Sequence, residues 1–204
     1  MDKREAQEQL DYVTRILERS TQYTNISAWS AISVGIIGTA AGAYSEWILK
    51  GSMAYVEYVQ ALFYCWSASF AVSIAAAIFF SARRARRMKE RLWVTPIKHA
   101  VRHFAVFIFI GGILTLALSS LNFFFLIPSV WMLCYGGGIF IGSSYSLKEV
   151  RWLGTFFLAA GSLTVFDPRL NQILLMSTFG LGHLVLGGIV YFKYNRLTPK
   201  GEYL

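Results

Sequence analysis

Residues 104–147 read FAVFIFIGGILTLALSSLNFFFLIPSVWMLCYGGGIFIGSSYSL, and none of these 44 side chains is charged. Basic residues flank the stretch on both sides: Lys98 and Arg102 before it, Lys148 and Arg151 after it. A single helix of this length would be about 66 Å long, roughly twice the hydrocarbon core of a bilayer. The stretch therefore predicts two membrane crossings joined by a turn between Asn122 and Pro128.

The composition of the whole chain agrees with a membrane protein. Of its 204 residues 55% are hydrophobic and only 15% are charged, and the mean hydropathy is +0.48. Such values lie outside the range of soluble domains and leave no room for a separate soluble domain. The net charge of +8 could indicate nucleic-acid binding in a soluble protein. Here the basic residues cluster between apolar segments, so we expect no direct binding of nucleic acid.

The apolar segments predict an all-α, polytopic membrane protein with six transmembrane helices. The expected spans are residues 26–49, 59–82, 104–121, 127–145, 150–166 and 170–192. They form one transmembrane domain over residues 25–193, followed by a cytoplasmic tail at 194–204. Residues 1–24 are predicted to form an amphipathic cytoplasmic helix, because apolar residues recur there at three- and four-residue steps. This helix could lie on the membrane surface or pack on its own protein.

The distribution of lysine and arginine predicts the orientation. Seventeen of these residues fall on one side of the six expected spans, and only Lys50 and Arg169 fall on the other. The positive-inside rule then places the N- and C-termini in the cytoplasm. The six spans become three helical hairpins that enter and leave on the cytoplasmic face.

The basic residues between the second and third spans are candidates for binding anionic phospholipid headgroups or a cytoplasmic protein partner. They are Arg83, Arg84, Arg86, Arg87, Lys89, Arg91, Lys98 and Arg102. Such a cluster attracts anionic lipid by about 1 kcal/mol per residue near the surface. It also suits an acidic protein surface, and the sequence leaves both readings open.

Three histidines are candidates for function. His183 is the ionisable residue nearest the middle of a span, so it is either an intramembrane functional group or a neutral residue that donates to a neighbouring helix. His99 and His103 are four residues apart and share a helix face, which makes them weak candidates for a metal site. Because no third ligand stands close in sequence, a basic collar facing lipid headgroups is the preferred reading. We expect no cofactor and no catalytic residues.

Two GxxxG patterns predict close helix packing, Gly38 to Gly42 in the first span and Gly138 to Gly142 in the fourth. Glycines let helix backbones approach, so van der Waals contacts can hold helices together in lipid. Packing within the monomer is the preferred reading, and a face for a homo-oligomer is the alternative.

The sequence before and within the first span resembles a family of uncharacterised bacterial multi-pass inner-membrane proteins. The run Glu18, Arg19, Ser20 and Thr21 precedes a first span rich in serine and glycine, although Ala28 and Ala31 stand where relatives often have glycine. The resemblance covers about an eighth of the chain. It implies a location in the bacterial inner membrane and a gene for a small winged-helix regulator nearby, and it brings no activity.

Three classes of function remain. The first is a non-enzymatic membrane sensor or scaffold that works through its cytoplasmic face. The alternative is a small transporter or channel with a path past His183 and the hydroxyl groups of the spans. The least supported class is an enzyme, whose cytoplasm-facing cleft would use His99, His103 and either Glu90 or Glu149.

Overall fold

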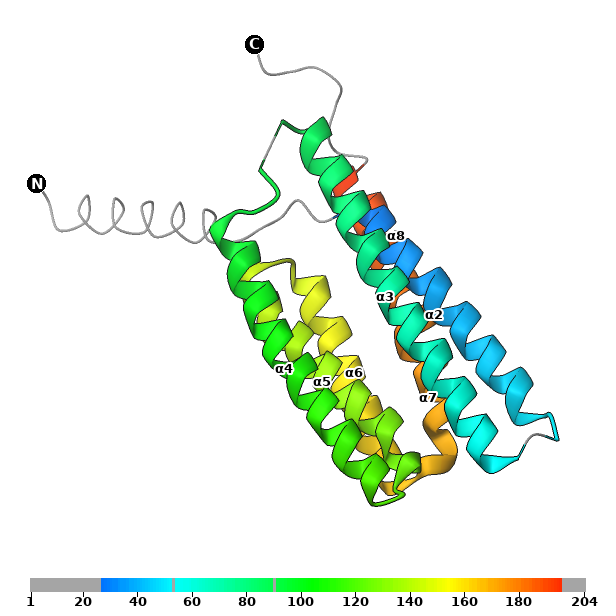
Figure 1. Ribbon diagram of the computed structural model, residues 1–204. Helices are drawn as coiled ribbons and strands as arrows, with labels where there is room; N and C mark the ends of the chain where they lie inside the picture. Colours follow the sequence, from blue (N-terminus) through cyan, green and yellow to red (C-terminus); the bar gives the residue numbers. More distant parts are fainter. Residues whose placement is uncertain (1–26, 53, 90, 196–204) are drawn as a thin grey trace, which may run out of the picture.

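The computed structural model describes residues 27–52, 54–89 and 91–195, and this part of the chain is all-α (Figure 1). Five helical segments are long and apolar enough to cross a membrane: α2 (Ala28–Leu49), α3 (Tyr55–Arg87), α4 (Thr95–Ser120), the segment Phe124–Tyr145 and the segment Pro168–Tyr194. The chain is therefore a helical membrane protein. The amphipathic helix expected at residues 1–24 lies outside the described residues.

The remaining helix, α6 (Lys148–Phe166), has 19 residues and a polar beginning. Lys148, Glu149 and Arg151 occupy its first turn. The apolar part that follows is about 22 Å long, whereas the hydrocarbon core of a bilayer measures about 30 Å. This short apolar length distinguishes α6 from the five candidate spans.

The segments at 124–145 and 168–195 are interrupted helices. The first consists of the 3₁₀ turn η1 (Phe124–Leu126), α5 (Ile127–Gly142) and η2 (Ser143–Tyr145). The second, called the C-terminal helix below, contains η3 (Pro168–Leu170), α7 (Asn171–Leu175), η4 (Met176–Gly182), α8 (His183–Val190) and η5 (Tyr191–Asn195). Both η4 and η5 are π-helical, a rare conformation that often accompanies functional or tightly packed sites.

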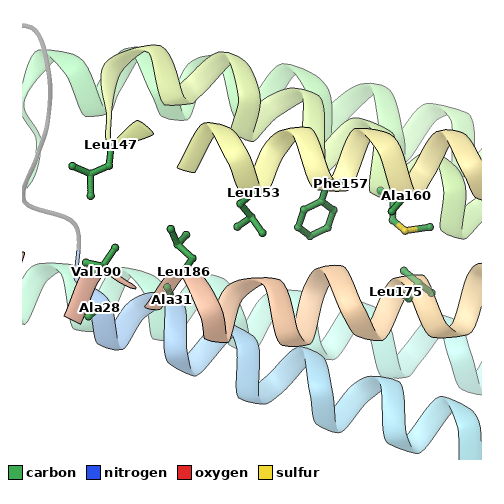
Figure 2. Packing of buried hydrophobic residues seen from close by; sticks show 10 residues of the cluster. Ala28, Ala31, Leu147, Leu153, Phe157, Ala160, Leu175, Leu186 and Val190 are labelled. Atoms are coloured by element: carbon green, nitrogen blue, oxygen red, sulfur yellow. The ribbon is translucent and has the colours of Figure 1, made fainter. Parts of the chain in front are cut away.

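The helices form two groups of three (Figure 1). In one group α5 packs between α4 and α6, and in the other α2 packs between α3 and the C-terminal helix. The two groups meet where α5 and α6 face the C-terminal helix. Figure 2 shows Leu153 and Phe157 of α6 pointing toward Leu175 and Leu186 across this contact, which forms the buried apolar core.

Small residues explain why α2 can lie at the centre of its group. Its buried positions follow one helix face: Ala28, Ala31, Gly35, Gly38, Ala41, Gly42, Ser45 and Ile48. This face packs on the C-terminal helix so closely that a Cβ atom at Gly38 would lie 2.5 Å from the carbonyl oxygen of Phe179. Since lipid removes the hydrophobic drive between helices, such close van der Waals contact is what stabilises the pair.

The helix ends follow local sequence rather than hydropathy alone. Asn122 adopts a φ of 61° after α4 ends, and Pro128 lies in the first turn of α5, so the chain turns between these residues. Lys89, with a φ of 56°, follows the end of α3 in the same way. At 33 residues α3 is about 50 Å long, which exceeds even the full bilayer with its headgroups.

Candidate functional site

The last turns of α3 carry a cationic surface, called the arginine hollow below. Arg83, Arg86 and Arg87 are exposed and share one helix face, because residues three and four apart are neighbours on a helix. Together with Phe79 and Ala82 they line an open hollow of about 480 Å³. Among the described residues, no carboxylate forms an ion pair with these three arginines. The hollow therefore presents guanidinium groups beside an apolar surface.

The other residues of the predicted basic cluster have different surroundings. Arg84 is only half-exposed and makes a contact of its own. Lys89 and Arg91 are exposed in the connection to α4, while Lys98 and Arg102 are exposed on the first turns of α4. The structure thus places the predicted basic residues on two helix ends and the loop between them.

His99 and His103 lie against an aromatic ring. Tyr145 of η2 is roughly parallel to both imidazoles, with ring centroids 5.5 Å from His99 and 6.0 Å from His103. The guanidinium of Arg102 donates to Nδ1 of His99 over 2.9 Å. Within the described ranges, no group of three histidine, cysteine, aspartate or glutamate residues could hold a metal ion.

Glu149 lies at the same end of the bundle but joins other partners. Its carboxylate accepts a hydrogen bond from Lys193 Nζ at 2.5 Å and one from the Tyr194 hydroxyl at 3.2 Å. Partial burial alone would raise the pKa of this carboxyl, but the hydrogen bonds and charge of Lys193 bring the pKa below its ordinary value. Glu149 therefore links α6 to the C-terminal helix rather than to His99 or His103. Glu90, the other acid of the enzyme hypothesis, lies outside the described residues.

His183 is 4% exposed and both of its ring nitrogens have partners. Nδ1 lies 3.3 Å from the carbonyl oxygen of Thr178, and Nε2 lies 2.9 Å from the hydroxyl of Tyr135. A carbonyl can only accept, so Nδ1 carries the proton and Nε2 accepts from Tyr135. This assignment satisfies a neutral imidazole completely.

Aromatic rings surround this polar pair. Phe157 of α6 and Phe179 of η4 lie 4.8 and 4.9 Å from the Tyr135 ring, and Phe179 is stacked on His183. The cluster joins α5, α6 and the C-terminal helix at the contact between the two helix groups. Its geometry is that of a packed aromatic core.

Four of the hydroxyl groups that a transport path could use bond within their own helices, whereas the buried hydroxyl of Ser129 has no hydrogen-bond partner among the described residues. Ser177 donates to the carbonyl of Ile173 at 2.7 Å, Thr178 to that of Leu174 at 2.7 Å, and Ser143 to that of Phe140 at 2.5 Å. Ser33 likewise donates to the carbonyl of Trp29. These groups are satisfied without water, as expected of serine and threonine inside helices.

The four GxxxG glycines face other helices of the same chain. A Cβ atom at Gly42 would lie 3.0 Å from the Met176 side chain, and one at Gly138 would lie 2.8 Å from Phe104 of α4. At Gly142 it would meet Ala100 at an ordinary 3.6 Å. These contacts, with that of Gly38 described above, occupy the predicted faces inside one monomer.

Sequence reasoning missed Tyr135 and the π-helical segment. Thr178, whose carbonyl oxygen faces the imidazole, stands five residues before His183. A π turn brings residues at this spacing close together. A tyrosine beside Gly136, Gly137 and Gly138 is the one signal that could have indicated a ring packed between close helices.

Comparison with known proteins identifies no relative. No family model, no curated protein and no solved structure matches the chain. The resemblance to bacterial inner-membrane proteins, whose residues 18–21 lie outside the described part, stays a prediction.

Proposed function

We propose that the chain is a non-enzymatic protein of the bacterial inner membrane that acts as a sensor or scaffold through its cytoplasmic face. In this proposal α6 is the fifth of six spans, the spans form three hairpins and both termini are cytoplasmic. The distribution of basic residues supports this orientation. The short apolar part of α6 is compatible with crossing, since Lys148 and Arg151 can extend toward the headgroups and the bilayer can thin locally.

The arginine hollow is the observation that carries the proposal. Because α3 is longer than the bilayer is thick, its final turns extend to the headgroup region or beyond it. There, planar guanidinium groups can bind carboxylates through two parallel hydrogen bonds, and the Phe79 ring offers an apolar contact beside them. This combination suits an acidic segment of a cytoplasmic protein partner better than it suits charge attraction to lipid alone.

The two other classes have less support. A transport path past His183 would need the polar groups of the spans to face a common space. In the structure the two imidazole nitrogens are already hydrogen-bonded, one to Tyr135 and one to Thr178. An enzyme built on His99, His103 and Glu149 would need these groups to converge, whereas Glu149 pairs with Lys193.

The test is affinity purification of the tagged protein from its own membranes in mild detergent, with mass spectrometry of what is retained. We expect a stoichiometric cytoplasmic protein that the variant Arg83→Ala/Arg86→Ala/Arg87→Ala loses. Arg84 is kept because it makes a separate contact.

The matched control replaces the same three arginines by lysine, which keeps the charge and removes the planar fork. If the lysine variant also loses the partner, recognition depends on the two parallel hydrogen bonds that a guanidinium makes to a carboxylate. Vesicles containing phosphatidylglycerol provide the second measurement, since lipid attraction depends on charge and should survive the lysine variant. A partner that the alanine variant retains would contradict the proposal, and a tightly held small molecule in place of a protein would favour transport.

A further inference from the structure

A second hollow lies in the outer surface of the bundle, between α6 and the C-terminal helix. This apolar groove has a volume of about 270 Å³. Its walls are apolar side chains that are well exposed: Trp152, Phe156, Leu181, Val185 and Ile189. Trp152 is 74% exposed and Val185 52%, so the walls rise from the protein surface toward the surrounding membrane.

The floor of the groove exists because residue 182 is a glycine. Leu153 and Leu186, which Figure 2 shows facing each other between the helices, are buried beneath the walls. Gly182 lies beside them at the end of η4, and a Cβ atom there would come within 2.8 Å of Leu153 Cδ1 and 3.6 Å of Phe156 Cδ1. A side chain at this position would occupy the groove.

The length and ends of the groove identify its occupant. On the C-terminal helix the lining residues extend from Ser177 to Ile189, a rise of about 18 Å, which is close to half of a hydrocarbon core of about 30 Å. The groove therefore reaches through one leaflet. At its charged end lies Glu149, whose partner Lys193 donates to that carboxylate and lies over the Tyr194 ring; the Lys193 side chain is 59% exposed, so its ammonium can also donate to another anion.

We propose that this groove is a binding site for one phospholipid of the leaflet at the basic end, with an acyl chain on Gly182 and the phosphate beside Lys193. An apolar chain in the groove covers the exposed wall residues, while the ammonium of Lys193 stabilises the phosphate by a charge-assisted hydrogen bond. The site is separate from the arginine hollow and does not depend on a protein partner.

The test is native mass spectrometry of the detergent-purified full chain after titration with dioleoylphosphatidylglycerol or dioleoylphosphatidylethanolamine. We expect one phospholipid per chain to persist after excess lipid is removed. The variant Gly182→Leu fills the groove and should weaken retention about tenfold or more. Its Cβ is closest to the flexible end of Leu153, and the backbone oxygen of Ser177 lies at an ordinary contact distance of 3.4 Å, so the fold can adapt.

The matched control is Gly188→Leu on the same helix, because a Cβ atom at Gly188 meets nothing within 4 Å. It should retain lipid as the unaltered chain does, and Lys193→Gln should weaken retention of both headgroups. Equal retention by the Gly182 and Gly188 variants would overturn the proposal.

A photoactivatable phospholipid with a diazirine in its acyl chain gives a test that needs no substitution. Reconstituted in vesicles of phosphatidylethanolamine and phosphatidylglycerol, it should label Trp152, Phe156 and Val185 more than the exposed α4 residues Ile113 and Leu116. Equal labelling of α4 and the groove would show ordinary contact with bulk lipid and would overturn the site.

Discussion

His183 and Tyr135 form a polar pair inside an apolar bundle, and the energetics of this pair follow from its partners. Placing an imidazole or a phenol hydroxyl among phenylalanine rings is unfavourable unless each polar atom is hydrogen-bonded. Here the tyrosine hydroxyl donates to Nε2 and the imidazole donates to the Thr178 carbonyl. The pair is thus a specific link between α5 and the C-terminal helix.

The first prediction concerns this link. Tyr135→Phe leaves Nε2 of His183 without a donor, and we expect a loss of about 1–3 kcal/mol in the free energy of unfolding. His183→Leu should cost a similar amount, because the tyrosine hydroxyl loses its acceptor. The double variant should cost less than the sum, by up to about 1.7 kcal/mol, the largest such coupling seen between membrane helices.

The free energy of unfolding is measured in mixed micelles for the unaltered protein, the two single variants and the double variant. Partner or ligand association serves as the functional readout. Strict additivity would show that the two side chains do not interact. A stable His183→Leu protein that has lost partner or substrate binding would assign His183 a functional role instead of a structural one.

The second prediction concerns Glu149 and pH. The pKa of this carboxyl is lower in the folded protein than its ordinary value near 4.5, so the folded state favours the ionised form. Its contribution to stability is present above that value and is lost as pH falls through the lower, folded pKa. We therefore expect the melting temperature to fall more steeply between about pH 5 and pH 3 in the unaltered protein than in Glu149→Gln. Parallel melting curves for the two proteins would contradict the link to Lys193.

At the scale of elements, hydropathy locates the apolar segments but not the helix ends. The expected span at 59–82 lies within α3, which continues through Glu57 at one end and Arg83 to Arg87 at the other. Polar residues can extend a helix once it leaves the hydrocarbon, and hydropathy does not register this extension. The expected span at 104–121 likewise falls, except for its last residue, in a helix that begins at Thr95, where Pro96 occupies the first turn.

The π-helical segments could not be predicted for a different reason. Local sequence in η4, Met176 to Gly182, has the same apolar character as a regular helix. The wider turn is instead associated with contacts from other helices: Gly38 of α2 against the Phe179 backbone, and Tyr135 of α5 on the His183 ring. These partners lie on helices that a single sequence does not place side by side. The basic residues of the arginine hollow were predicted as a cluster between two spans, whereas the structure places Arg83, Arg86 and Arg87 on one face of the extended helix α3.

The third prediction concerns the contact between α2 and the C-terminal helix. Gly38→Ala puts a methyl group 2.5 Å from the carbonyl oxygen of Phe179, closer than van der Waals contact allows, so the two helices must separate. Overpacking of this kind costs about 1–3 kcal/mol or more, and we expect a clear drop in melting temperature. The control is Gly112→Ala on α4, where a Cβ atom meets nothing within 4 Å and alanine favours the helix by up to about 1 kcal/mol. If Gly38→Ala changed oligomeric state and not monomer stability, this face would belong to a homo-oligomer.

At the scale of the whole molecule, the two helix groups carry different surfaces at the same end. The end of α3 and the start of α4 both lie at the upper end of the bundle in Figure 1, one in each helix group, and the loop that contains Lys89 and Arg91 joins them. The start of α6 is tied to the end of the C-terminal helix by Glu149 and Lys193. The helix that carries the arginine hollow also reaches the buried core, because Trp66 of α3 packs on Phe179 and donates to Ser45.

The orientation of α6 decides whether all these surfaces share one compartment. If α6 crosses the membrane, Lys148 and Arg169 lie on opposite sides and both termini lie in the cytoplasm. If α6 does not cross, Lys148 and Arg169 lie on the same side of the membrane. Replacing Cys65 and Cys134 by alanine and introducing a single cysteine gives the test, because an impermeant maleimide labels only the outer face of intact cells. We expect labelling of Ser52→Cys, Asn122→Cys and Arg169→Cys from outside, and of Met88→Cys and Lys148→Cys only after permeabilisation. Identical behaviour of Lys148→Cys and Arg169→Cys, with both labelled or both protected in intact cells, would remove α6 from the spans.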